Sequence, residues 1–322
     1  MNINICVIGI YFGKLPQYFN LWLKSAEKNS QIDFLIFTDC HYKKLPKNVR
    51  FINMRLSDVK KRADNVIGFE IELSKPYKCC DYRPCFGLMF KDYLQDYDYW
   101  GHCDFDMIFG DIMSYLKKFK IQKYDKFLSQ GHLAFYRNTP ENNNRFWMDG
   151  AVCGTQKEVF TLQKAFAFDE TSGIGSIFKK NKYSYFDKRI FADITPIHNR
   201  FTLTGNDKNY DDQVFYWKDG KVYRSYVENS ELKIEEFIYI HFQKRGNLEV
   251  HNYNEINQCF FVTKSGFYPM NSEYATMMDI QKYNPYKSNI IEKYEEFIYQ
   301  CKIWIFRFKR KIECLKIWLS QF

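Results

Sequence analysis

The sequence predicts an α/β fold in which a mostly parallel sheet is followed by a C-terminal helical extension. Two observations predict it: the first hundred residues alternate short apolar runs with segments of helical periodicity, and the last 35 residues change to a basic amphipathic pattern. The chain has 322 residues, of which 46% are hydrophobic and 26% charged. These values are ordinary for a packed globular protein and exclude a disordered chain. The length suits two domains, or one large α/β domain with additions.

Four apolar runs in the first hundred residues are expected to be strands, at residues 3–11, 32–38, 49–54 and 97–103. Helical spacing lies between the first two runs, and further helices are expected after Ser57, read as an N-cap, and over residues 84–95. Strands and helices that alternate at these lengths form a Rossmann-type sheet of the nucleotide-binding kind. In such sheets, ligands lie at the carboxyl ends of the strands.

The middle of the chain is less regular. Its pattern predicts strands at residues 127–136, 221–226 and 237–241 and a helix at 156–166. Residues 251–287 are interpreted as a connecting segment and residues 288–322 as a C-terminal helix.

The composition indicates an anionic partner and a reducing environment. The net charge is +9, and 31 Phe, 25 Tyr and 6 Trp make 19% of the chain aromatic. Phosphate, nucleic acid or an acidic membrane would each suit this balance. Of the ten cysteines, Cys6, Cys40 and Cys103 lie in apolar runs, and Cys79, Cys80 and Cys85 lack the paired spacing of a zinc site. We therefore expect reduced thiols and a cytoplasmic chain without a secretory signal or a membrane-spanning segment.

A pair of aspartates follows the last of the four predicted strands. Asp104 and Asp106 stand at i and i+2, where both carboxylates can turn toward one point as the chain leaves the sheet. Hard oxygen ligands at this spacing suit Mg²⁺ or Mn²⁺ held against a diphosphate. The competing interpretation is a solvated turn whose aspartates cap the next helix.

A second group of candidate residues lies 135 residues further on. His241 ends a predicted strand, and Lys244 and Arg245 follow it. The imidazole could complete the metal site, and the two cations could hold phosphate oxygens. The alternative is a histidine at the edge of the core followed by a solvated basic turn.

Several segments together resemble a bacterial family of GT-A-type glycosyltransferases encoded in capsule and lipopolysaccharide (O-antigen) gene clusters. They are IGIYFGKLPQYFNLWLKS, FLIFTD, KPYKCCDYRP, WGHCDFDMIFGD and YIHFQKR. The similarity covers about residues 1–245 and is strongest over 1–137. It implies a GT-A-like catalytic domain at 1–250, with a nucleotide-sugar half at 1–111 and an acceptor half at 112–250. It also implies a UDP-sugar donor, Mn²⁺ or Mg²⁺, and transfer to a growing, lipid-linked glycan.

The resemblance assigns roles to particular residues. Asp104 and Asp106 match the DxD pair that binds the metal, with Asp104 also near the nucleotide, and His241 matches a late metal-contacting histidine. Lys244 and Arg245 would hold the diphosphate. The positions expected to line the nucleotide pocket are Tyr11, Phe12, Asp39, Lys78, Asp81 and Arg83. For Lys78 and Arg83 a solvated surface charge is the alternative, and for Tyr11 and Phe12 it is ordinary core packing.

An inverting transferase also needs an Asp or Glu whose carboxylate acts as a base and takes a proton from the acceptor hydroxyl. The candidates are Asp149, the pair Asp169 and Glu170, and the pair Asp211 and Asp212. By analogy with the acceptor-side loop of GT-A enzymes, Asp169 and Glu170 are preferred, whereas a retaining enzyme would need no such base. His132 and Arg137 are candidates for the acceptor side.

The C-terminal tail has the pattern of a helix that lies on an anionic membrane. Between residues 302 and 316 there are six basic residues and one acid, and apolar residues recur every three or four positions. The expected location is therefore peripheral, on the inner face of the plasma membrane. The alternative is a helix packed on the protein's own core.

Two other functions fit parts of the sequence. A metal-dependent nuclease or nucleotidyl-transfer enzyme would use the basic, aromatic surface for nucleic acid but would leave the tail without a role. An inactive membrane-bound scaffold is the second alternative, and the intact Asp104/Asp106 pair speaks against it.

Overall fold

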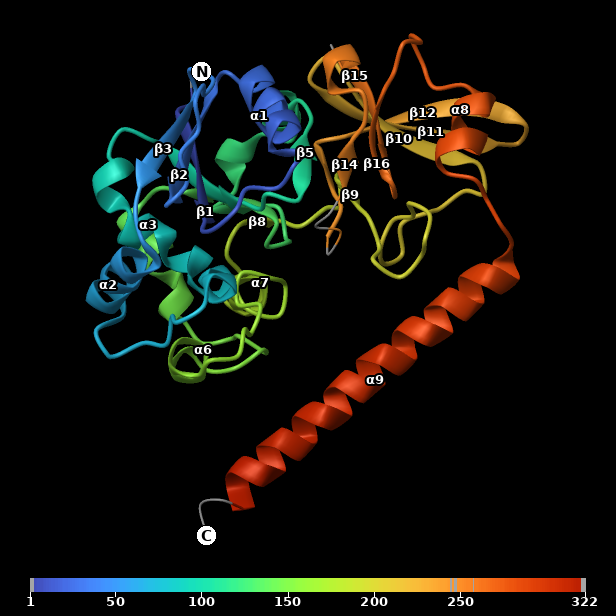
Figure 1. Cartoon of the computed structure of the whole chain (residues 1–322). Coiled ribbons are helices and arrows are strands. Elements are labelled where there is room, and N and C mark those ends of the chain that lie inside the picture. The colour runs from blue at the N-terminus through green and yellow to red at the C-terminus, as the bar shows by residue number, and fades with distance from the viewer. Residues whose placement is uncertain (1–2, 244, 246–247, 257, 320–322) are drawn as a thin grey trace. The chain divides into compact units, whose positions relative to one another are not determined.

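The structure is a computed structural model that describes residues 3–243, 245, 248–256 and 258–319 (Figure 1). The chain forms two compact units. The first comprises Met1–Ala192, Asp219–Val222 and Phe237–His241, and the second comprises Asp193–Lys218, Tyr223–Glu236 and Phe242–Phe322. The two units are defined by their internal contacts and not by function. The catalytic domain expected at 1–250 and its two functional halves therefore stay a prediction.

A seven-stranded sheet forms the centre of the first unit, with the order β3-β2-β1-β4-β7-β6-β8. The first four strands are mutually parallel, and β7 runs antiparallel to β4 and β6. The predicted α/β fold with a largely parallel sheet is confirmed. The strand bounds are β1 (Ile5–Tyr11), β2 (Ile32–Thr38), β3 (Val49–Asn53), β4 (Tyr99–Cys103), β6 (Lys126–Phe127), β7 (Leu133–Arg137) and β8 (Tyr185–Phe186).

Helices cover both faces of this sheet. One apolar core joins the sheet to α1 and α4, and another joins its opposite face to α2, α3, α6 and α7. Side chains alternate between the two faces of a strand, which is why Ile5 and Val7 lie in the first core while Cys6 and Ile8 lie in the second. The α-helices are α1 (Phe19–Lys28), α2 (Leu56–Ile67), α3 (Phe86–Met89), α4 (Ile112–Lys118), α5 (Pro140–Asn143), α6 (Gln156–Thr161) and α7 (Ile174–Lys180), and the 3₁₀ segments are η1 (Pro76–Cys85), η2 (Lys91–Tyr93), η3 (Ile121–Lys123) and η4 (Arg145–Trp147).

Four local predictions from the sequence are corrected. The continuous helix expected over residues 84–95 is divided among η1, α3 and η2, because the backbone leaves the helical conformation at Phe90, which has φ −119° and ψ 24°. The strand expected at 127–136 is interrupted where Leu128 has φ 73°. Helix α2 begins at Leu56 rather than after Ser57, and the helix expected at 156–166 ends at Thr161.

Beyond β4, the chain enters a separate three-stranded sheet. Strand β5 (Met107–Phe109) pairs antiparallel with β13 (Tyr239–His241), and β9 (Ala192–Asp193) is the third strand. The register sets His241 opposite Met107. Gly110 lets the segments after β5 and before β13 approach closely, because a Cβ at this position would lie 2.6 Å from the carbonyl oxygen of Phe237. This pairing brings His241 next to the segment that carries Asp104 and Asp106.

The second unit is built on a six-stranded sheet with the order β12-β11-β10-β15-β16-β14. Its apolar core includes Val214, Tyr216, Phe261 and Ile280. Residues 251–287, interpreted from sequence as a connecting segment, contain two strands and a helix of this unit. The elements are β10 (Gln213–Lys218), β11 (Lys221–Glu228), β12 (Glu231–Phe237), β14 (Glu249–Val250), η5 (Tyr253–Glu255), β15 (Cys259–Thr263), β16 (Gly266–Pro269), α8 (Met277–Tyr283) and α9 (Asn289–Leu319).

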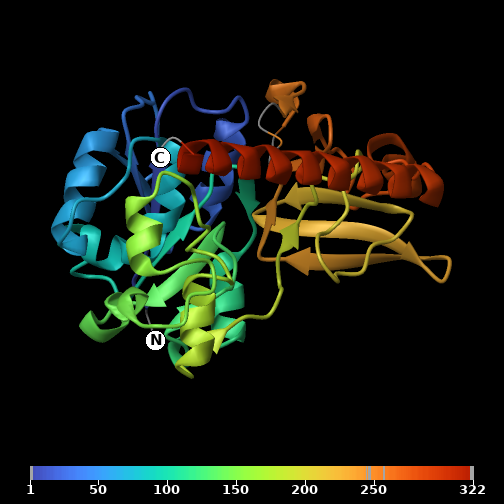
Figure 2. The ribbon, with the colours of Figure 1, turned by 90° about the horizontal axis from the view of Figure 1, so that it is seen from below.

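Helix α9 is attached to the second unit at its first turns. Glu292 pairs with Arg200, Glu295 accepts from the backbone and side chain of Asn199, and Glu296 lies 3.2 Å from His198 Nε2. Figures 1 and 2 show α9 as one unbroken helix. Among the described residues no helix has both the length and the apolar character needed to cross a membrane.

Candidate functional site

The carboxyl ends of three neighbouring parallel strands meet at one edge of the main sheet. Tyr11 ends β1, Asp39 follows β2, and Asp104 follows β4. The loops after β1 and β2 are joined, because the N–H of Gly13 donates to Asp39 Oδ1 at 3.1 Å. Tyr11 lies against Phe105, with ring centroids 5.0 Å apart. Tyr11, Phe12 and Asp39 thus lie at the strand ends where a ligand of such a sheet is expected.

Asp104, Asp106 and His241 form a cluster of potential metal ligands. Each offers an atom within 4.8 Å of the others. His241 Nε2 lies 3.4 Å from Asp106 Oδ1 and 3.8 Å from Asp104 Oδ2. Burial opposes ionisation of Asp106, yet the hydrogen bond and charge of His241 lower the pKa of Asp106 below its ordinary value. The cluster therefore combines two carboxylates with one imidazole.

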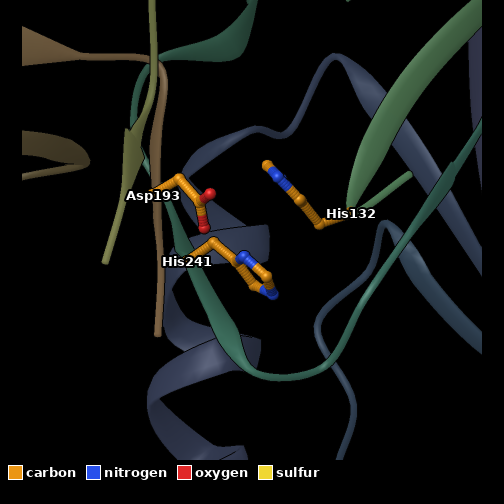
Figure 3. Close-up of side chains that lie close together, drawn as sticks. All are labelled: His132, Asp193 and His241. Atoms are coloured by element: carbon orange, nitrogen blue, oxygen red, sulfur yellow. The ribbon is translucent and has the colours of Figure 1, made fainter. Parts of the chain in front are cut away.

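His132 supports this cluster from the loop before β7. Its ring stacks on His241, with centroids 4.2 Å apart and planes 18° apart (Figure 3). Tyr239 Oη lies 2.8 Å from His132 Nδ1, and the carbonyl of His132 accepts from the N–H of Asp104 at 2.9 Å. Burial, followed by the charge of His241, lowers the pKa of His132 well below its ordinary value. A neutral His132 thus packs beside the histidine of the cluster.

Arg83 connects the aspartate pair to a second acidic group. Its guanidinium pairs with Asp104 on one side and donates to Asp169 Oδ2 at 2.8 Å on the other. It also donates to the carbonyl of Gly131 at 2.8 Å. The Arg83 side chain is only 16% exposed, so these partners hold most of its donors inside the protein.

Asp169 and Glu170 lie close to this arginine and have raised proton affinities. Burial raises the pKa of Asp169 to about 7; Arg83 opposes the shift, while Glu170 and Asp104 add to it. Burial is also the main cause of the raised pKa of Glu170. A carboxylate that titrates near neutrality can accept a proton from a bound hydroxyl group. The raised pKa values of Asp169 and Glu170 are compatible with this role, which stays a prediction.

Lys78 and Asp81 lie inside the protein, away from solvent. Lys78 is 3% and Asp81 0% exposed, and their charged groups are 2.7 Å apart. Their other partners are backbone groups of residues 159–168. The solvated-charge alternative for Lys78 is therefore wrong, because burial and three acceptors hold its ammonium.

The surroundings of the remaining candidates differ from one to the next. Asp149 is exposed, and Arg137 pairs with Asp125 at 3.1 Å. Arg245 belongs to the second unit, where it donates to the carbonyls of Thr195 and His198. Lys244 lies outside the described residues. The nine cysteines from Cys6 to Cys301 are free, and within the described ranges no zinc-like cluster includes Cys79, Cys80 or Cys85.

Two residues of the site were not identified from the sequence. Gly131 gives its carbonyl to Arg83, and a Cβ there would lie 2.4 Å from Asp169 Oδ2. Tyr239 bonds to His132. An isolated glycine inside the strand predicted at 127–136 and the i, i+2 spacing of Tyr239 and His241 were the available signals.

Most of the sequence matches a protein family. Residues 7–271 match the family described as a family of unknown function (DUF6625). The chain belongs to this family. No curated protein matches the DUF6625 chain.

Two solved structures show similarity to this DUF6625 protein. A galactosyltransferase named LgtC, in complex with donor and acceptor sugar analogues, has a TM-score of 0.36 and 11% identity over 59% of this chain and 76% of its own. Mouse xyloside xylosyltransferase 1 in its apo form has a TM-score of 0.37 and 6% identity over 77% of this chain and 100% of its own.

Proposed function

We propose that this protein is a metal-dependent glycosyltransferase that moves a sugar from a nucleoside diphosphate, UDP in our proposal, to a growing lipid-linked capsule or lipopolysaccharide glycan. The observation that carries the proposal is the cluster of Asp104, Asp106 and His241, whose ligand atoms lie within 4.8 Å of one another after β4. Parallel α/β sheets bind ligands at this edge. The sequence segments that resemble capsule and lipopolysaccharide transferases include the same residues.

The donor set fits a divalent ion of the first transition row. Two carboxylates supply hard oxygen ligands, and the imidazole of His241 adds a nitrogen. This mixture suits Mn²⁺ better than Mg²⁺, which prefers oxygen ligands alone. When bound, the ion would neutralise negative charge on the departing diphosphate.

The protein's own groups would bind and orient the two substrates. Tyr11, Phe12 and Asp39 are suited to the nucleoside, because they lie at the ends of β1 and β2. In an inverting transfer the acceptor oxygen bonds to the anomeric carbon, and the bond from that carbon to the diphosphate oxygen breaks. The electrons of the broken bond remain on the diphosphate, and Asp169 or Glu170 takes the proton of the acceptor hydroxyl.

The proposal includes a peripheral position on the inner face of the plasma membrane. Apolar side chains on α9 are exposed at Ile290, Tyr294, Phe297, Trp304 and Phe308. Their spacing gives one stripe along the helix, and the sequence adds six basic residues between positions 302 and 316. Apolar rings beside positive charges favour binding to an anionic lipid surface.

The function is tested by nucleotide release. Purified protein is incubated with UDP- and GDP-sugars, Mn²⁺ and glycoside acceptors, and released nucleoside diphosphate is measured. We expect Mn²⁺-dependent release from one UDP-sugar, with at least a hundredfold loss in Asp106→Asn. Asp111→Asn is the matched control, because Asp111 lies in the same motif but caps α4 through Ser114. Cleavage of nucleic acid without nucleotide-sugar turnover would support the nuclease alternative instead.

A further inference from the structure

Segment η1 carries three charged residues that all contact residues 159–170. They are Lys78, Asp81 and Arg83, within the run PYKCCDYRPC. The sequence resemblance suggests that they reach toward the nucleotide. Their partners in the structure point to a different task for the first two.

The ammonium group of Lys78 has three acceptors inside the protein. It donates to Asp81 Oδ2 at 2.7 Å, to the carbonyl of Val159 at 2.6 Å and to the carbonyl of Lys164 at 2.7 Å. An ammonium has three hydrogens, so these three bonds use all of them. Lys78 is therefore committed to Asp81, to α6 and to the loop after α6, and has no hydrogen left for a phosphate oxygen.

Asp81 holds the next part of the same loop. Its carboxylate accepts from the N–H of Phe166 at 3.0 and 3.1 Å and from the N–H of Phe168 at 3.0 Å. Between them, Ala167 has φ 54°, a left-handed conformation that a residue with a side chain adopts only when its surroundings impose it. The N–H groups on both sides of this turn are thus bonded to the same carboxylate.

The turn leads directly to the candidate base. Asp169 follows Phe168 and accepts from Arg83, which comes from the same η1 segment. Thus Lys78 and Asp81 of η1 form hydrogen bonds with backbone groups of residues 159–168, and Arg83 of η1 donates to the carboxylate of Asp169. A shift of the turn would move Asp169 and Glu170 relative to Asp104.

We propose that Lys78 and Asp81 are positioning residues, whose buried ion pair fixes the turn at residues 166–168 and so sets Asp169 and Glu170 beside Arg83. The catalytic meaning rests on the proposed function, whereas the structural meaning does not. A buried charged pair is costly to desolvate, and it is kept here for the backbone groups that it orders.

The test compares Asp81→Asn and the double variant Lys78→Met/Asp81→Leu with wild type. The double variant removes both charges together, so that no unpaired buried charge remains. Lys60→Met is the matched control, because Lys60 forms a half-exposed pair with Asp64 at 2.9 Å on α2. Thermal unfolding first establishes that each variant is folded.

Hydrogen exchange measures the structural part. The N–H of Glu170 bonds to Ala167 and that of Ile174 to Phe168, and Asp81 touches neither. We expect at least tenfold faster exchange of both amides in the two test variants and no change in Lys60→Met. Unchanged exchange would overturn the proposal, even if wild type shows no transferase activity.

Binding and turnover measure the catalytic part. We expect the affinity for Mn²⁺ with UDP to stay within twofold of wild type, whereas kcat falls at least tenfold. A tenfold loss of UDP affinity with an ordered loop would overturn the proposal and return Lys78 to a direct phosphate role. Absent turnover in wild type would count against the proposed function alone, because the exchange result still decides the role of the pair.

Discussion

Asp104 and Asp106 have different surroundings although one residue separates them. Asp104 pairs with Arg83, and its carbonyl accepts from Trp22 Nε1 at 3.2 Å. His241 Nε2 lies nearer to Asp106, at 3.4 Å, than to Asp104, at 3.8 Å. Asp104 is therefore fixed by the protein on several sides, while Asp106 depends on a residue from a distant strand.

We expect Asp106→Asn to weaken Mn²⁺ binding at least tenfold, equivalent to about 1.4 kcal/mol. The reason is that the amide removes the ligand charge that His241 stabilises. Mn²⁺ titration followed by electron paramagnetic resonance measures the affinity. Asp111→Asn should bind the ion as wild type does, and equal losses in both variants would contradict the assignment.

The raised pKa of Asp169 predicts opposite effects of pH on activity and on stability. Activity should fall as pH drops below about 7, because the buried carboxyl then holds a proton and cannot accept one. Its pKa is higher in the folded than in the unfolded chain, so this group lowers stability as pH rises from about 4 to about 7.

Asp169→Asn should accordingly abolish activity. Its free energy of unfolding, relative to that of wild type, should be about 1–3 kcal/mol higher at pH 8 than at pH 5, because only wild type loses stability as this carboxyl ionises. Urea unfolding at both pH values provides the measurement. A gain that is equal at both values would show that burial of the Asp169 charge carries no such cost.

Residue roles were only partly predictable from the sequence. The spacing of Asp104 and Asp106 and their place after an apolar run predicted that their carboxylates lie close together, as they do; their binding of a metal stays a prediction. Lys78 and Arg83 look alike in one short motif, but their partners lie about 80 residues away. The partners of a charged side chain depend on tertiary packing, which local spacing does not contain.

At the scale of elements, strand pairing assembles the cluster. The antiparallel register of β5 with β13 sets His241 opposite Met107. The close approach at Gly110 is part of this pairing, since any side chain there would meet the carbonyl oxygens of Phe237 and Ile238.

Gly110→Ala should displace β13 and destabilise the protein by about 1–3 kcal/mol, because the backbone contact cannot relax easily. It should also weaken Mn²⁺ binding through His241. Chemical unfolding and Mn²⁺ titration measure the two effects. Gly175→Ala, which lies within α7, is the comparison. Full Mn²⁺ affinity in Gly110→Ala would argue against His241 as a ligand.

The alternating strands and helices were predictable because apolar periodicity records burial on a sheet or a helix face. The places of the antiparallel strands β7 and β13 in their sheets were less predictable, because these places depend on partner strands that are distant in sequence. Gly87 was visible as a residue of low helix propensity, yet the apolar residues around it suggested an uninterrupted helix.

For the whole molecule, the C-terminal helix is the feature with the most distinct chemistry. Helix α9 is joined to the second unit through Glu292, Glu295 and Glu296, while Tyr294, Phe297 and Trp304 are exposed. Sequence predicted a helix in this place, and its role at a membrane stays a proposal.

Deletion of residues 289–322 should release the protein from vesicles that contain anionic lipid, because it removes the apolar stripe and the basic residues together. Vesicle sedimentation measures binding, and transfer to a soluble acceptor should be largely retained. Vesicle binding that is unchanged by the deletion would show that the helix serves the protein's own packing.

The central claim is most directly tested by calorimetric titration of UDP, GDP and single-stranded DNA, with and without Mn²⁺, into wild type and Asp106→Ala. We predict micromolar binding of UDP that requires Mn²⁺ and is lost in the variant. Metal-independent binding of DNA, with no binding of either diphosphate, would contradict a glycosyltransferase.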